Sequence, residues 1–175
     1  GKGNPQEIQE LVDALHHGPK PVPPFHWHIE FPEVFSRECP GFDAFVGNPP
    51  FLGGKRISTA HGDGYRDWLA VLHADASSNS DLIAHFFRRA FVQLREGGAS
   101  GLIATNTIAQ GDTRAGGLRW ICVNGGTIYN ARKHVRWPAP GAAVIVSVVH
   151  VAKACHPCLR CALDGRAVER VTAFL

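Results

Sequence analysis

The sequence predicts an α/β fold, in which helices pack on the faces of a sheet. Short apolar runs typical of buried strands alternate along the chain with stretches whose apolar residues recur every three or four positions. Apolar residues make up 45% of the chain and charged residues 19%, a composition that excludes a disordered tail. The 175 residues suffice for one hydrophobic core, so one domain is expected.

The first predicted element is a helix that begins after Asn4, with Pro5 in its first turn and Glu7 placed to reach back to the cap. Its apolar stripe consists of Ile8, Leu11, Val12 and Leu15. A proline-rich connector, residues 18–24, follows the helix. Residues 25–31 alternate apolar and polar side chains, so they predict a short strand.

A second predicted strand covers residues 42–46, whose nearly continuous apolar character is typical of a strand buried on both faces. It stops at Pro49 and Pro50, because proline cannot donate to a strand ladder. Residues 52–64 are polar and contain glycines, which predicts a mobile loop. Residues 65–72 predict one short helix.

The second half of the chain predicts a helix capped by Ser80 and ended by Gly97 and Gly98. Three further strands, at residues 100–105, 127–131 and 142–151, and a short helix at 116–123 complete the expected elements. This order indicates a mostly parallel sheet whose late strands pair antiparallel.

Charge and cysteine content restrict the environment more than the function. The chain has 18 Lys and Arg against 15 Asp and Glu, a net charge of +3 that permits a nucleic-acid partner without requiring one. No apolar run is long enough to span a membrane and no signal peptide is visible, so a soluble, cytoplasmic protein is expected. Five cysteines, an odd number, predict reduced thiols. The absence of methionine suggests an excerpt of a longer protein.

The residues with the clearest chemistry directly follow the strand at 42–46, where reactive groups of open α/β sheets collect. The side-chain oxygen of Asn48 and the backbone carbonyl of Pro49 could accept both N–H bonds of an exocyclic amine on a nucleobase. These two hydrogen bonds would favour a tetrahedral geometry at the nitrogen and make its lone pair available. Pro50 would stiffen the backbone, and Phe51 offers a ring for stacking an extruded base.

The string Asn48-Pro49-Pro50-Phe51 after an apolar strand is similar to the catalytic motif of amino-methyltransferases that act on adenine N6 or cytosine N4. Its flanks resemble those of the Eco57I-type restriction-modification methylases. These flanks are FHWHIEFPEVF at residues 25–35, GFD at 41–43 and GLIATNTI at 101–108. The resemblance implies a Rossmann-like sheet that uses S-adenosylmethionine to methylate adenine N6 in double-stranded DNA after the base is flipped, in restriction-modification or phage defence.

The resemblance also implies further site residues. Asp81 and Leu82 begin the helix that lies near cofactor and base in the family, so they join Asn48 as expected cofactor-binding residues. Trp137 precedes a late strand and is the candidate for a second aromatic against the flipped base. Lys55 and Arg56 follow the catalytic string and are expected to meet DNA phosphates.

The chain departs from the family at its beginning. The family's glycine-rich turn and acidic residue, which cradle S-adenosylmethionine, lie before the catalytic string, whereas only 47 residues precede Asn48 here. We therefore expect an incomplete catalytic domain, its C-terminal half, inactive without the cofactor-binding and target-recognition parts. Within it, residues 1–24 form a helix and linker, 25–153 the sheet with the catalytic motif, and 154–175 a C-terminal extension.

Other functions remain open at this point. Methylation of cytosine N4 uses the same geometry, and the chain could be a non-catalytic remnant or binding module. His26, His28 and Glu30 share one face of the expected strand, but a solvated polar face accounts for them without a metal. The cysteine-rich tail has no fourth ligand at zinc spacing, so no metal is expected there; it contains Cys155, His156, Cys158 and Cys161.

Overall fold

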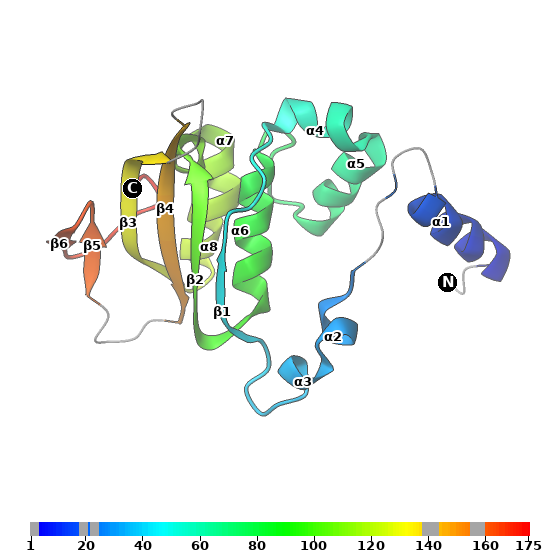
Figure 1. Ribbon diagram of the computed structural model, residues 1–175, viewed down its shortest axis with the longest axis horizontal. Coiled ribbons are helices and arrows are strands. Elements are labelled where there is room, and N and C mark those ends of the chain that lie inside the picture. Colours follow the sequence, from blue (N-terminus) through cyan, green and yellow to red (C-terminus); the bar gives the residue numbers. More distant parts are fainter. Residues whose placement is uncertain (1–3, 18–20, 22–24, 138–143, 155–159) are drawn as a thin grey trace. The chain divides into compact units, whose positions relative to one another are not determined.

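The computed structural model describes residues 4–17, 21, 25–137, 144–154 and 160–175. The chain divides into two units, Gly1–Arg37 and Glu38–Leu175. The first contains α1 (Pro5–His17), α2 (Trp27–Glu30) and α3 (Pro32–Phe35), and the second contains the sheet (Figure 1). The predicted start of the first helix is confirmed, since the side-chain oxygen of Asn4 accepts a hydrogen bond from the backbone N–H of Gln6 at 3.2 Å.

The strand predicted for residues 25–31 is wrong, because this segment contains the helical turn α2. The rings of Trp27 and Phe31 stack with centroids 5.9 Å apart, and Phe25 packs edge-on against Trp27 at 5.1 Å. Residues four apart meet in a helix, whereas in a strand they are separated by about 13 Å. Pro32 then occupies the first turn of α3. The aromatic contacts therefore favour a helical turn over the strand that the alternating pattern predicted.

The second unit has a mixed sheet of six strands in the order β1-β2-β4-β3-β5-β6. Their bounds are β1 (Phe42–Gly47), β2 (Leu94–Thr105), β3 (Gly126–Trp137), β4 (Val144–Lys153), β5 (Cys161–Leu163) and β6 (Arg166–Val168). β1 is parallel to β2, and β4 is antiparallel to both β2 and β3. The antiparallel late strands are thus confirmed. The sheet is only partly parallel and not mostly so: β1, β2 and β3 point the same way, but three of the five strand pairings are antiparallel.

The helices of this unit are α4 (Gly54–His61), α5 (Asp63–Leu72), α6 (Leu82–Gln93) and a continuous helical run that crosses from α7 to α8. The run comprises α7 (Gly111–Arg114), the π-helical turn η2 (Ala115–Arg119) and α8 (Trp120–Val123), preceded by the 3-10 turn η1 (Asn106–Ala109). α5 confirms the helix expected at 65–72. The loop expected at 52–64 is wrong, because α4 forms there and buries Ile57 against Leu69 and Leu82.

Two boundaries of α6 differ from the prediction. Asp81 rather than Ser80 caps the helix, since its side chain accepts from the backbone N–H of Ile83 at 3.0 Å, while the Ser80 hydroxyl donates to the carbonyl of Asp112. The helix ends at Gln93, and β2 begins at Leu94, before the glycine pair. Gly97 and Gly98 lie inside β2, where a side chain at Gly98 would lie 2.9 Å from the carbonyl oxygen of Phe42.

The two faces of the sheet differ. On one, α6, α7 and α8 group together (Figure 1), and the core forms between them and the strands. We call this the covered face; its strand residues include Leu102, Ala104, Val149 and Val151. The strand register places the alternate residues on the other side. We call that the open face; its residues are Ala44, Val46, Ala99, Gly101, Ile103, Val148 and His150. Val46 is 89% exposed.

Candidate functional site

Asn48 lies directly beyond the last residue of β1. Gly47 pairs with Leu102 of β2, so the motif begins where the parallel pair ends. Asn48 and Pro50 are exposed and Pro49 is half-buried. Alternation along β1 places Asn48 on the same side as Ala44 and Val46, the open face. Its carboxamide is therefore accessible at the carboxyl end of the strand.

A hollow of about 480 Å³ extends over the open face from Asn48. Its walls are mostly small and apolar, from Ala44 and Val46 of β1 to Val148 of β4, with Tyr129 and His150 at its far side. The volume lies within the usual range for small-molecule sites. The hollow places the Asn48 carboxamide at the margin of a cavity and not inside packed protein.

His150 is a polar residue of this hollow that the sequence did not single out. Its ring lies against Gly101, where an added Cβ would be 3.0 Å from the ring's Cδ2, and the Tyr129 ring lies 5.8 Å away between centroids. Its Nδ1 is buried and has no hydrogen-bond partner among the described residues. A glycine inside an apolar strand was the available signal for such a close approach.

The backbone after the motif is tied to the start of α6. Oδ1 of Asp81 accepts hydrogen bonds from the backbone N–H groups of Leu52 at 3.2 Å and Ile83 at 3.0 Å. In return, the N–H of Leu82 donates to the carbonyl of Leu52 at 2.9 Å. A Cβ on Gly54 would lie 2.5 Å from the backbone of Asn79, so the loop approaches this turn as closely as a glycine allows.

Asp81 and Leu82 thus have structural roles at the site. Leu82 is 3% exposed and packs with Ile57 and Leu69, and Leu52 of the loop after the motif packs against this cluster. The N–H of Asp81 donates to the Thr113 hydroxyl at 3.0 Å, which joins α7 to the same point. Oδ1 of Asp81 carries both hydrogen bonds from the motif loop and the start of α6, and Oδ2 accepts none from the described residues.

Phe51 is half-buried and packs against the core cluster of the covered face. One part of its ring therefore fixes the loop and the other part is exposed beside Pro50. Stacking of a nucleobase on Phe51 stays a prediction, with the exposed part of the ring as the surface that would be used.

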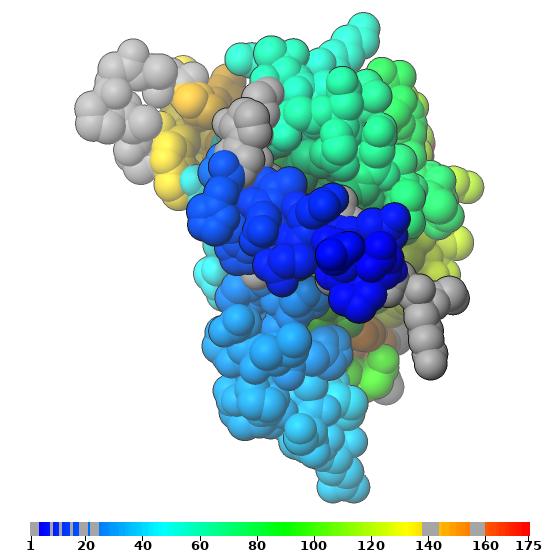
Figure 2. Space-filling view, turned by 90° about the vertical axis from the view of Figure 1, so that its right-hand side faces the viewer, coloured from blue at the N-terminus to red at the C-terminus, as the bar shows by residue number. Residues whose placement is uncertain are grey.

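The cations expected near DNA lie on a helix and not in a loop. Lys55 and Arg56 occupy the first turn of α4 and are exposed. Figure 2 shows α4 and α5, in turquoise, as part of the outer surface of the second unit. Trp137, 38% exposed, ends β3. Three strand steps separate β3 from β1, so the stacking of Trp137 on a base held at Asn48 stays a prediction.

A buried histidine pair joins α6 to the end of α5. Nδ1 of His73 and Nδ1 of His85 are 2.8 Å apart, and the rings stack. Burial, reinforced by the nearby positive charge of Arg88, lowers the pKa of His73 to about 3 and that of His85 to about 4. Both rings are therefore neutral near pH 7, and one donates its proton to the other.

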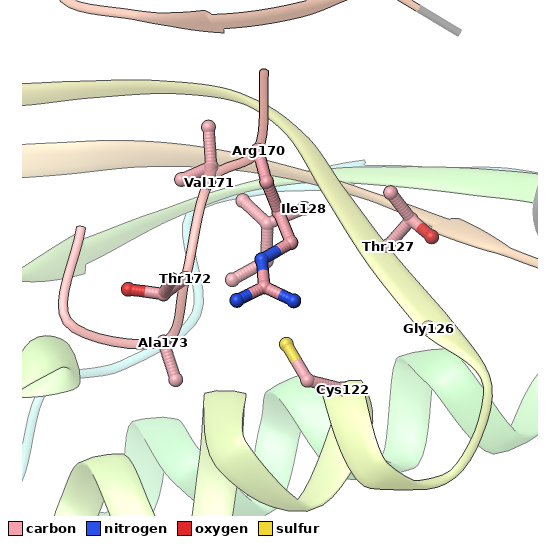
Figure 3. A pocket seen from close by; sticks show the side chains of 8 residues that line it. All are labelled: Cys122, Gly126, Thr127, Ile128, Arg170, Val171, Thr172 and Ala173. Atoms are coloured by element: carbon pink, nitrogen blue, oxygen red, sulfur yellow. The ribbon is translucent and has the colours of Figure 1, made fainter. Parts of the chain in front are cut away.

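A second hollow, of about 310 Å³, lies at the start of β3, the opposite edge of the sheet from Asn48. In Figure 3 the Arg170 guanidinium points toward the Cys122 thiol between Ile128 and Thr172. Burial raises the pKa of Cys122, and the positive charge of Arg170 opposes that rise. The hollow shares no lining residue with the one at Asn48.

The residues considered as metal ligands are not assembled in the described part of the chain. Within it, no cluster of three or more His, Cys, Asp or Glu side chains could bind a metal ion. The His28 ring stacks on Phe35 with centroids 4.0 Å apart, and Cys161 is buried in the core cluster. The tail residues Cys155, His156 and Cys158 lie outside the described residues. Every helix that the structure describes is too short or too polar to cross a lipid bilayer.

Comparisons with protein families and with solved structures both give matches. A family model described as Eco57I restriction-modification methylase matches residues 4–124. Among solved structures, the Type IIL restriction-modification enzyme MmeI in complex with DNA is similar, with a TM-score of 0.59 and 18% sequence identity. The alignment covers 88% of this chain and 21% of that chain, so the chain spans about a fifth of that enzyme's length. A search of curated protein sequences gave no match.

Proposed function

Because the chain belongs to the Eco57I restriction-modification methylase family, we propose that it holds the exocyclic amino group of adenine in DNA while that nitrogen is methylated. The observation that carries the proposal is the position of Asn48. Its carboxamide is exposed at the carboxyl end of a parallel strand, beside a hollow, on a loop held by hydrogen bonds.

The chemistry follows from two acceptors on a stiff backbone. Oδ1 of Asn48 and the carbonyl oxygen of Pro49 accept the two N–H bonds of the amine. Conjugation with the purine ring makes that nitrogen a poor nucleophile, and the two hydrogen bonds favour the tetrahedral geometry in which its lone pair is available. The clamp at Leu52 and Asp81 keeps these acceptors in place before the base arrives, so little reorganisation is needed.

A base can reach Asn48 only after leaving the duplex, and Phe51 offers the exposed part of its ring to stack on it. When bound, S-adenosylmethionine supplies the methyl group. Asn48 and the Oδ2 oxygen of Asp81 are the groups of this chain that would hold that cofactor. The Asp81 oxygen fits this role because the described residues supply it with no hydrogen bond. The methylated nitrogen releases its extra proton to water, so no general base is required.

The partners proposed are DNA and the remainder of the methyltransferase. Lys55 and Arg56 are exposed beside the motif loop and are placed to contact phosphates. The open face is apolar and includes Val46 at 89% exposure, a surface that further protein would cover. We therefore assign the cofactor's glycine-rich cradle and the target-recognition part to other segments of the complete protein, a cytoplasmic enzyme of restriction-modification or phage defence.

The test is the substitution Asn48→Ala in the complete protein. We expect methyl transfer to DNA to fall by at least a hundredfold, since one of two amine acceptors is lost, while DNA affinity stays within about twofold. The matched control is Asn124→Ala, which removes a carboxamide at the opposite edge of the sheet. Radiolabelled methyl transfer and a DNA-binding titration measure the two quantities.

Mass analysis of the modified nucleosides identifies the acceptor. N6-methyladenine supports the proposal, whereas N4-methylcytosine would reassign the same geometry to cytosine. Equal turnover by Asn48→Ala and the unaltered protein would remove Asn48 from the mechanism. Absence of both methyl transfer and S-adenosylmethionine binding in the complete protein would instead identify a non-catalytic relative.

A further inference from the structure

β3 and β4 extend beyond the rest of the sheet as a two-stranded ribbon. The last residue of β2, Thr105, pairs with Val146, and Val146 also pairs with Val135 of β3. Beyond that row only β3 and β4 continue, with Arg136 opposite Ile145 and Trp137 opposite Val144. We call this extension, together with the neighbouring rows of β3 and β4, the basic ribbon; it comprises residues 132–137 and 144–148.

The basic ribbon has a concentrated positive charge. Residues 132–136 contain Arg132, Lys133 and Arg136 together with His134. Nζ of Lys133 donates to the carbonyl of Leu175 at 3.1 Å, and its backbone N–H donates to Asp164 at 2.7 Å, so this lysine belongs to the local packing.

The two arginines are different from Lys133. Arg132 and Arg136 are exposed, and neither side chain forms an ion pair or hydrogen bond with the described residues. Unpaired arginines suit phosphate oxygens, because the guanidinium presents a planar fork of donors. Trp137 adds an exposed ring beside them, an arrangement typical of nucleic-acid surfaces.

The register places this charge at the edge of the sheet that carries Asn48. One row of paired residues crosses β1, β2, β4 and β3; it consists of Gly47, Leu102, Val149 and Ala131. Arg132 is one residue beyond that row, hence level with Asn48. Three strand spacings separate the two positions, about 14 Å.

Arg136 pairs with Ile145, four residues along β4 from Val149, so it lies about 13 Å beyond the row. Alternation along β4 also places Arg132 on the open-face side and Arg136 on the other side of the ribbon. A bulge between Arg132 and Val135, with φ of 53° at His134, twists the ribbon at this point. Arg132 thus lies on the open-face side of the sheet, level with Asn48, and Arg136 lies on the opposite side of the two residue pairs that continue past β2.

We propose that the basic ribbon binds the backbone phosphates of the DNA duplex beside the extruded base, through Arg132 and Arg136. The assignment rests on the proposed function for the location of the base at Asn48. A duplex that delivers a base to Asn48 must lie across this edge, and within the sheet only β3 and β4 continue past the last residue of β2 there. Phosphate contacts of this kind orient the duplex without reading its sequence.

The experiment measures binding of the complete protein to a fluorescein-labelled 30-base-pair duplex over a series of NaCl concentrations. Each phosphate contact contributes about −0.9 to the slope of log K against log salt concentration. Arg132→Gln with Arg136→Gln should weaken binding about tenfold and reduce the slope's magnitude by about 2. Arg119→Gln, which removes an exposed arginine from the helical run on the covered face, is the control and should change the slope by less than 0.3.

A charge-preserving variant separates binding from folding. Arg132→Lys with Arg136→Lys should restore most of the slope, because phosphate attraction depends on charge. In methylation assays, the glutamine variant should raise KM for DNA about tenfold with kcat nearly unchanged, since it does not alter the acceptors at Asn48. A glutamine variant with the slope and KM of the Arg119 control would overturn the proposal.

The same measurements distinguish failure of the methylation proposal from failure of the ribbon proposal. If the unaltered protein transfers no methyl group but the glutamine variant still loses slope and affinity, the ribbon binds DNA and the methylation proposal fails. If the unaltered protein methylates DNA and the variant binds like the control, the methylation proposal stands and the ribbon proposal fails.

Discussion

The two faces of the sheet belong to the same strands but have opposite characters. On the covered face, Leu102 and Val149 are buried under α6 to α8 in a continuous core. On the open face, their immediate neighbours Ile103 and Val148 line a hollow that begins at Asn48. The difference shows that the core of the unit lies on the covered face, while the described residues leave the open face partly exposed around Asn48.

The largest effect expected from this comparison is on stability. Leu102→Ala should lower the free energy of unfolding by about 3–4 kcal/mol, because it leaves a cavity in a close-packed core. Ile103→Ala, one residue away on the open face, should cost about 1 kcal/mol, since its surroundings are already partly solvated. Urea denaturation of the 175-residue chain measures both. Equal losses for the two variants would mean that the faces do not differ in this way.

A smaller effect concerns the histidine pair on the covered side. Folding lowers the pKa of His73 and His85 below the value of about 6.5 for the unfolded chain, so the folded state favours the neutral rings. Their contribution is complete above pH 6.5 and is lost as the pH falls toward about 4, because protons then bind the unfolded chain preferentially. Between pH 7 and pH 5.5 stability should fall by about 2.5 kcal/mol, the sum for the two rings.

The control for this pH dependence replaces both rings by side chains that do not titrate. The double variant His73→Gln, His85→Gln can keep a hydrogen bond between the two amides, and its stability should vary much less over the same pH range. Thermal or urea unfolding at several pH values gives the comparison. A slope in the double variant as steep as that of the unaltered chain would assign the acid sensitivity to other groups.

The smallest effect expected is at the junction between the faces, where Asp81 holds the motif loop. Asp81→Ala removes the helix cap and the acceptor for Leu52, and should cost about 1–2 kcal/mol. Asp81→Asn keeps a cap and should cost less than 1 kcal/mol. Hydrogen exchange at the Leu52 amide should quicken in the alanine variant only; unchanged exchange there would show that the clamp does not restrain the loop.

The parts of the structure that the sequence predicts are those determined by the pattern of apolar residues and prolines within a short segment. The apolar run at 42–46 and the prolines after it located β1 and its end, and with them Asn48. α4 was missed because Ile57 is the one apolar side chain of that helix buried in the core, too little for a periodic signal. Likewise, aromatic rings four residues apart overrode the alternating pattern at 25–31.

What the pattern could not supply depends on residues distant in sequence. The clamp joins Leu52 to Asp81 across 29 positions, and its partners become neighbours only in the folded chain. Four of the last six residues of β3 are basic or polar, and Val135 and Trp137 alone are too few for a strand pattern; the segment is extended because β4 pairs with it. The basic ribbon was therefore invisible before the topology was known.

The strand order also determines how the sheet can assemble. β3 is synthesised before β4, yet it does not border β2; β4 lies between them. During synthesis, β3 can join the sheet only after β4, which ends at Lys153, has been made. A nascent chain that stops earlier has no strand to connect β3 to β2. The matched family segment ends at residue 124. The link from β2 to β3, and with it the row of residues from Asn48 to Arg132, is therefore complete only after β4, well past that segment, has paired.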